Sequence, residues 1–122
     1  MFNVMVKPSS PPTLVLSGRL DSATAPKLEQ ALDGVLARGP IARLVFDLGA
    51  LDYLSSAGIR CFIRARKAIE PQGGSVAVVN PQPAVRKVLD IVQAIPAGGI
   101  FANVQELDEY LDEMQRKVRE NE

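Results

Sequence analysis

Short apolar runs of strand length alternate along this chain with longer segments whose apolar residues recur every three or four positions. An alternating or continuous apolar run is typical of a strand, whereas a spacing of three to four is typical of a helix that buries one face. The predicted strands are residues 2–7, 13–17, 41–48, 75–79 and the very short segment 100–101. The predicted helices begin near residue 21 or 22, at residue 56, near residue 83 and near residue 104.

The resulting order, β-β-α-β-α-β-α-β-α, predicts an α/β fold. We expect one mixed, largely parallel sheet of four to five strands with about four helices packed against it. A connection rich in Pro and Ser, residues 8–12, joins the first two strands and indicates an antiparallel hairpin. Right-handed crossovers then place the inner strands side by side. The length of 122 residues predicts a single domain over residues 1–122, with an ordered core over about 2–118 because the last residues fray.

Residues 51–60 join a hydrophobic strand to an amphipathic helix through two adjacent serines, Ser55 and Ser56. Serine is among the most favoured N-cap residues, so a helix cap is the simplest interpretation of either one. The same position offers free backbone N–H groups and the positive end of the helix dipole, which attract a phosphate, bound or covalent. Two serines in a row allow both roles, one capping and the other free.

Asp21 follows the second predicted strand much as the two serines follow the third. Functional loops of a largely parallel sheet gather at the carboxyl ends of its strands. We therefore expect Asp21, Ser55 and Ser56 to share one edge of the sheet. Asp21 is equally a candidate for the cap of the helix that follows it, as is Ser22. Both interpretations of Asp21 stand at this point.

The composition argues against several classes of function. The chain has no histidine, which removes the usual general base, so neither a Ser-His-Asp nor a Cys-His mechanism can form within it. Cys61 is its one cysteine, so no disulfide framework and no cysteine-based zinc site forms within one chain. The glycine pairs at 73–74 and 98–99 lack the lysine and hydroxyl of a phosphate-binding loop, and no carboxylate cluster indicates a metal site. We expect no enzyme, and hence no catalytic residue, cofactor or metal.

Positive and negative charges balance, with 14 Lys and Arg against 14 Asp and Glu. No overall field therefore attracts nucleic acid or an anionic membrane. No apolar stretch reaches the roughly 20 residues of a membrane helix, and the N-terminus lacks the layout of a signal peptide. We expect a soluble cytoplasmic protein that binds no nucleic acid and does not insert into a membrane.

Several motifs together resemble the STAS domain, the fold of bacterial anti-sigma factor antagonists and of the cytoplasmic tails of sulfate transporters. The resemblance covers nearly the whole chain, and the order and spacing of its motifs make it specific. The motifs are Ser17-Gly18-Arg19-Leu20-Asp21 with the following Ala-Thr-Ala, Leu44-Val45-Phe46-Asp47-Leu48, Tyr53-Leu54-Ser55-Ser56-Ala57-Gly58-Ile59, and Val79-Asn80-Pro81 leading into Val85-Arg86-Lys87-Val88-Leu89.

The resemblance implies an anti-sigma factor antagonist. Such a protein binds an anti-sigma factor that is itself a serine kinase of the GHKL type, and so regulates a sigma factor. Phosphorylation of one serine switches the binding off, and a phosphatase of the PP2C type reverses it. The family pattern aligns that serine with Ser56, with Ser55 as the alternative acceptor, because Ser55 stands where the family has an aspartate. The implied partner-binding residues are Asp21, Ser55, Ser56, Gly58 and Arg60.

A second hypothesis is a non-phosphorylated STAS subunit that docks on an ABC-type lipid or anion transport system, in which case Ser56 only caps its helix. Under either hypothesis we expect a monomer or a weak dimer. Three polar or reactive residues elsewhere are interpreted as structural: Cys61 as a small apolar filler, and Asp47 and Asn80 as residues that close turns after strands.

Overall fold

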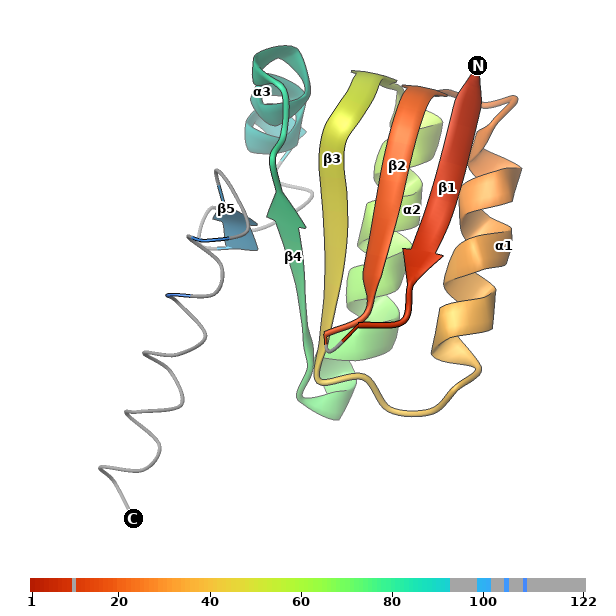
Figure 1. The fold of residues 1–122 in the computed structure, drawn as a ribbon, viewed down its shortest axis with the longest axis vertical. Helices are drawn as coiled ribbons and strands as arrows, with labels where there is room; N and C mark the ends of the chain where they lie inside the picture. The colour runs from red at the N-terminus through yellow and green to blue at the C-terminus, as the bar shows by residue number, and fades with distance from the viewer. Residues whose placement is uncertain (10, 93–98, 102–104, 106–108, 110–122) are drawn as a thin grey trace.

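Five strands form one sheet in the order β1-β2-β3-β4-β5 in the computed structural model (Figure 1). The structure describes residues 1–9, 11–92, 99–101, 105 and 109. β1 and β2 are antiparallel, and the other neighbouring pairs are parallel, which confirms the predicted hairpin and the largely parallel sheet. The strands are β1 (Phe2–Lys7), β2 (Thr13–Leu20), β3 (Arg43–Leu54), β4 (Ser75–Val79) and β5 (Ile100–Phe101).

Three α-helices accompany the sheet in the part of the chain that the structure describes. They are α1 (Ala25–Leu36), α2 (Ser56–Ile69), which ends in the 3-10 turn η1 (Glu70–Gln72), and α3 (Pro83–Val92). α1 and α2 lie side by side on one face of the sheet, while α3 lies beyond the carboxyl end of β4 (Figure 1). Of the fourth helix, predicted to begin near residue 104, the structure describes only Gln105 and Glu109, which are both helical, and the rest falls outside the described residues. None of the described helices has the length and apolar character needed to cross a membrane.

The main core fills the space between the sheet and the two helices α1 and α2. Phe46 of β3 meets Phe62 of α2 edge to face, with ring centroids 4.7 Å apart and ring planes at 89°, a favoured geometry for two aromatic rings. The fully buried aliphatic residues around this pair include Leu14, Leu16, Leu28, Leu32, Leu44 and Leu89. A smaller buried cluster, formed by Val45, Ala77, Val79 and Phe101, alternates along the strands with the main core and so belongs to the other face of the sheet.

β3 runs through Leu54 rather than ending at residue 48 as predicted. Its pairing with β2 shifts twice: the pairs Val15–Asp47 and Ser17–Ala50 enclose one extra residue of β3, and so do Gly18–Leu51 and Arg19–Tyr53. Each extra residue is a bulge, which breaks the in-and-out alternation and bends the strand. The burial pattern of residues 49–54 therefore repeats every three positions instead of every two. The loss of alternation explains why the sequence predicted too short a strand.

The start of α1 also differs from the prediction. The N-cap residue is Thr24, without a side-chain cap bond of its own, rather than Asp21 or Ser22. Asp21 instead stabilises the turn before the helix, because its Oδ1 accepts the N–H groups of Ala23 and Thr24 at 3.0 and 3.1 Å. Ser22 is exposed.

Candidate functional site

The carboxyl ends of β2 and β3 meet at one edge of the sheet. Leu20 pairs with Leu54, and the N–H of Ser55 donates to the carbonyl of Leu20 at 2.9 Å. The next residues along the two strands are Asp21 on one and Ser55 and Ser56 on the other. The expectation that Asp21 and the two serines share one edge is therefore confirmed by the register of the strands.

The two serines have different environments. Ser55 is the N-cap residue of α2, with extended backbone (φ −94°, ψ 173°), and its hydroxyl oxygen accepts the N–H of Gly58 at 3.4 Å. Ser56 is the first residue of the helix and is exposed, and its hydroxyl contacts no polar group of the described residues. One serine caps and the other is free, as expected, and the structure identifies Ser55 as the cap.

The helix start is electrostatically suited to an anion. The first turn of α2 contains no acidic residue, so its free N–H groups and the positive end of its dipole are not compensated there. A phosphate on Ser56 gains about 0.3–1 kcal/mol from this dipole. Arg60, one turn further along, is exposed and makes no ion pair with a described residue. The helix end can therefore carry a phosphate without a change of fold.

Gly58 allows the start of α2 to lie close against the sheet. A Cβ atom at this position would come within 2.7 Å of side-chain carbons of both Leu20 and Leu54, a distance that real Cβ atoms do not reach. Gly58 is buried, so it lies beneath the surface rather than on it. Gly58, which was predicted to bind a partner, is therefore not at the surface. It allows the helix to lie close to the sheet.

Asp21 carries its charge in a fixed orientation. Its Oδ2 lies 3.6 Å from Nε of Arg19, while its Oδ1 holds the turn before α1. Desolvation acts to raise the pKa of Asp21, but the hydrogen bonds from Thr24 and Ala23 and the charge of Arg19 outweigh it and lower the pKa. The carboxyl group is therefore ionised at neutral pH, at the same edge of the sheet as the free hydroxyl of Ser56.

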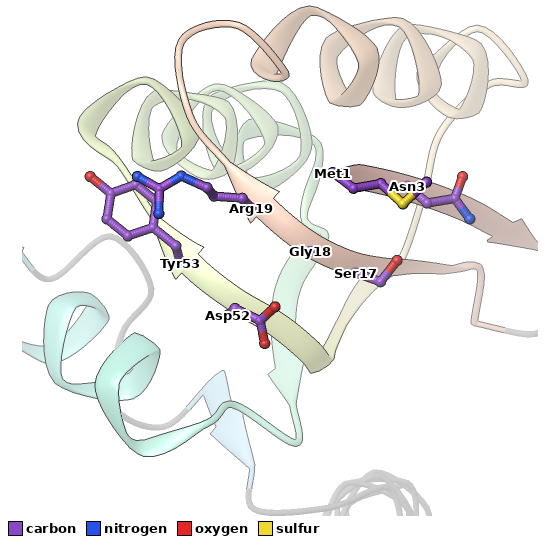
Figure 2. Close-up of a pocket in the computed structure, with 7 residues that line it drawn as sticks. All are labelled: Met1, Asn3, Ser17, Gly18, Arg19, Asp52 and Tyr53. Atoms are coloured by element: carbon purple, nitrogen blue, oxygen red, sulfur yellow. The ribbon is translucent and has the colours of Figure 1, made fainter.

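Two residues that were not predicted to be functional, Arg19 and Tyr53, lie at this edge on the face of the sheet away from α1 and α2 (Figure 2). The guanidinium carbon of Arg19 lies 3.8 Å from the ring centroid of Tyr53, because the second bulge in β3 makes these residues a cross-strand pair. Both border an open hollow of about 550 Å³ between the ends of β1, β2 and β3, which Asn3, Ser17 and Asp52 also line (Figure 2). Gly18 lies at this shift with a left-handed backbone (φ 86°), and a glycine within a strand often marks a bulge, but the apolar period alone does not predict the pair.

The residues interpreted as structural have structural surroundings. Cys61 is buried, and desolvation, reinforced by the charge of Glu29, raises the pKa of its thiol to about 11. Asn80 has a left-handed backbone (φ 58°) after β4, and its Nδ2 donates to Oδ1 of Asp47 at 3.2 Å. Asp47, however, lies within β3 rather than after a strand, so its predicted role in closing a turn is wrong. It braces the loop after β4 from the neighbouring strand.

Comparison with known proteins finds relatives that are named as anti-sigma factor antagonists. BtrV of Bordetella bronchiseptica, by its name a candidate anti-sigma factor antagonist, is 38% identical over 76 residues. That alignment covers 62% of this chain and 65% of BtrV, so the chain spans slightly less than two thirds of the relative's length. The described residues include no group of His, Cys, Asp or Glu that could hold a metal ion.

Solved structures share the fold over nearly the full chain. A crystal structure of an anti-sigma factor antagonist from Mycobacterium paratuberculosis has a TM-score of 0.75 and 27% identity, covering 94% of this chain and 95% of that one. SpoIIAA of Bacillus in its phosphorylated form has a TM-score of 0.69 and 17% identity, covering 89% and 99%, a likeness of fold alone. A sequence profile of the STAS domain matches residues 4–107. Because this match covers well over half of the sequence, the chain belongs to the STAS domain family.

Proposed function

We propose that this protein is an anti-sigma factor antagonist that binds an anti-sigma factor with serine kinase activity and is released from it when Ser56 is phosphorylated. The observation that carries the proposal is the free, exposed hydroxyl of Ser56 at the start of α2, on the same edge of the sheet as the ionised Asp21. The names of BtrV and of the Mycobacterium paratuberculosis protein support the same function.

The environments of the two serines favour Ser56 over Ser55 as the acceptor. In a kinase reaction the serine oxygen forms a bond to the γ-phosphorus of ATP, the bond to the β–γ bridging oxygen breaks, ADP leaves, and the hydroxyl proton is lost to a base or to water. The oxygen must therefore be accessible. The Ser56 hydroxyl is exposed and free, whereas the Ser55 hydroxyl is partly buried and accepts the N–H of Gly58.

Phosphorylation is expected to change the surface rather than the fold. A phosphoserine adds about −1.5 to −2 charges at neutral pH, and at Ser56 the helix dipole stabilises it. The carboxylate of Asp21 lies at the same edge of the sheet as this dianion. A partner that buries this edge must dehydrate both groups or supply cations to them, which costs several kcal/mol in the absence of compensating charge. Release of the partner follows from local charge alone.

Ser55 is where this chain departs from the family pattern, which has an aspartate there. The structure places the Ser55 side chain on the backbone of α2 rather than in solvent. Asp21 follows β2 at the same edge of the sheet and brings a carboxylate there. We propose that Asp21 supplies the acidic group that the partner recognises beside the acceptor serine.

The test uses the GHKL-type kinase encoded nearest to the gene for this protein. The purified kinase and ATP are incubated with the wild-type chain, with Ser56→Ala and with Ser55→Ala, and the products are mapped by peptide mass spectrometry. A phosphate on Ser56 that is absent from Ser56→Ala and present in Ser55→Ala is expected, as is its removal by a PP2C-type phosphatase. A phosphate on Ser55 would contradict the assignment of the acceptor. No binding and no phosphate on the wild-type chain would contradict the proposal and favour docking on a transport system.

A further inference from the structure

Arg19 and Tyr53 form a preorganised pair on the face of the sheet away from α1 and α2 (Figure 2). The Arg19 guanidinium is held by the Tyr53 ring, 3.8 Å away, and by the Asp21 carboxylate, 3.6 Å from its Nε. The pair nonetheless remains accessible, since 57% of the Arg19 side chain and 40% of Tyr53 are exposed. Binding to a partner ordinarily costs conformational freedom at a long side chain. The contacts with Tyr53 and Asp21 already restrict the Arg19 side chain in the free protein, so less conformational freedom is lost on binding.

The guanidinium of Arg19 keeps its hydrogen-bonding capacity for a ligand. It donates no hydrogen bond to any residue in the described part of the chain, and its distance to Asp21 is too long for one. Its N–H donors form a rigid planar fork that matches the two oxygens of a carboxylate. Asp21 approaches only the Nε side of that fork, because its Oδ2 lies 3.6 Å from Nε while its Oδ1 is engaged by the backbone of the turn before α1.

The pair is one wall of the hollow of about 550 Å³ at the ends of β1, β2 and β3 (Figure 2). The backbone connects this hollow to the edge that carries the two serines. Arg19 precedes Leu20, whose carbonyl accepts the N–H of Ser55. Both bulges of β3 lie in this region, and bulges are over-represented beside functional sites because they re-aim side chains. Tyr and Arg are also the residue types that most often dominate the energy of a protein interface.

We infer that this hollow is a second contact site for the anti-sigma factor, in which Arg19 binds the carboxylate of an Asp or Glu side chain of that partner and Tyr53 packs against it. The inference rests on the proposed function and extends its docking surface from Ser56 across the outer face of the sheet. The cationic guanidinium of Arg19 favours an acidic occupant, and its ion pair with Asp21 offsets part of that charge. Arg19 is the group held in position, and Asp52, exposed in the same hollow without an ion pair to a described residue, opposes a partner acid.

The test measures the affinity of the unphosphorylated chain for the anti-sigma factor encoded nearest to its gene, by isothermal titration calorimetry. Arg19→Gln is expected to weaken binding about tenfold or more, the size typical of a central interface residue. Arg38→Gln is the matched control, because it removes the same charge from an exposed residue past the far end of α1. It is expected to stay within about twofold of the wild type. Circular dichroism verifies that both variants are folded.

Three further variants test the charge of the occupant and the contribution of the Tyr53 ring. Asp52→Asn is expected to strengthen binding, because it removes an acid that repels the partner's carboxylate. Tyr53→Phe keeps the ring and is expected to bind as the wild type does, whereas Tyr53→Leu is expected to weaken binding several-fold. Equal affinities for Arg19→Gln and Arg38→Gln, or a loss of affinity in Asp52→Asn, would overturn the inference and leave the proposed function standing. No binding by the wild-type chain would overturn both.

Discussion

The N–H of Ser55 donates to the carbonyl of Leu20 at 2.9 Å, which joins the N-cap of α2 to the last residue of β2. This one hydrogen bond continues the strand pairing of β2 and β3 into the helix start. It fixes where the helix begins relative to Asp21, and so determines that the free hydroxyl of Ser56 and the carboxylate of Asp21 share an edge. The site is thus a product of strand register, not of a long loop.

Ser56→Asp tests whether a negative charge at the helix start releases the partner without unfolding the protein. An acidic side chain in the first turn of a helix interacts favourably with the dipole, by about 0.3–1 kcal/mol. We expect an unchanged circular dichroism spectrum, a thermal midpoint equal to or slightly above that of the wild type, and weaker binding to the anti-sigma factor. Ser56→Ala serves as the control that keeps binding. A folded Ser56→Asp that binds as tightly as Ser56→Ala would show that charge at this position is not the switch.

Gly58→Ala tests the close packing of α2 on the sheet. The added Cβ would lie 2.7 Å from carbons of Leu20 and Leu54, so the core must shift, at a cost of about 1–3 kcal/mol for overpacking. Gly34→Ala is the matched control in α1, where a Cβ meets nothing within 4 Å. It is expected to raise the unfolding free energy by about 0.5–1 kcal/mol, because Gly is unfavourable within a helix. Urea unfolding of both variants measures the difference, and equal stabilities would contradict the packing argument.

The sequence predicted most of the fold because apolar periodicity reports directly on burial. The runs that became β1, β4, α1 and α2 each follow one period without interruption, and the short connection at residues 8–12 implied the hairpin. β3 was predicted too short because its two bulges replace the alternation beyond Leu48 with a period of three. A glycine within a strand is a local sign of a bulge, and Gly49 and Gly18 lie at the two shifts, but the apolar period does not show how the pairing changes there.

The sequence also predicted part of the candidate site, because the order of the strands determines which residues meet at one edge. That Asp21 and the serines meet follows from strand order alone. The assignment of Ser55 as the cap depends on the extended backbone at that residue, which two adjacent serines do not disclose. The Arg19–Tyr53 pair depends on the second bulge of β3 and was not predictable.

Ser55→Ala and Ser55→Asp separate the cap from the switch. Loss of a serine cap costs about 0.5–2 kcal/mol, and the long bond of 3.4 Å to the N–H of Gly58 places Ser55 at the lower end of that range. We expect Ser55→Ala to be slightly less stable and still phosphorylated on Ser56. Ser55→Asp restores the family's acid and remains a good cap, so it is expected to match wild-type stability and to be phosphorylated faster. Slower phosphorylation of Ser55→Asp, measured with the same kinase, would contradict a favourable role for acid beside Ser56.

The lowered pKa of Asp21 predicts a contribution to stability that depends on pH. Because the folded-state pKa lies below the unfolded one, the contribution is fully present above the unfolded pKa and is lost as pH falls through the folded pKa. Asp21→Asn should therefore lose less stability than the wild type between pH 5 and pH 2, measured by urea unfolding across that range. Parallel curves for Asp21→Asn and the wild type would show that the contacts of Asp21 do not favour its charged form.

Cys61 is expected to be unreactive in the folded protein, although it lies close to the free start of α2. Burial raises the pKa of its thiol to about 11, and the carboxylate of Glu29, 3.9 Å from the sulfur, adds to the shift. Only the thiolate reacts with a disulfide reagent, so at pH 8 the folded chain should react far more slowly than the chain in denaturant. Raising the pH toward 11 without unfolding should accelerate the reaction. Glu29→Gln should lower the pKa and quicken labelling at pH 8, whereas rapid labelling of the folded wild type would identify Cys61 as an accessible thiolate instead of an apolar filler.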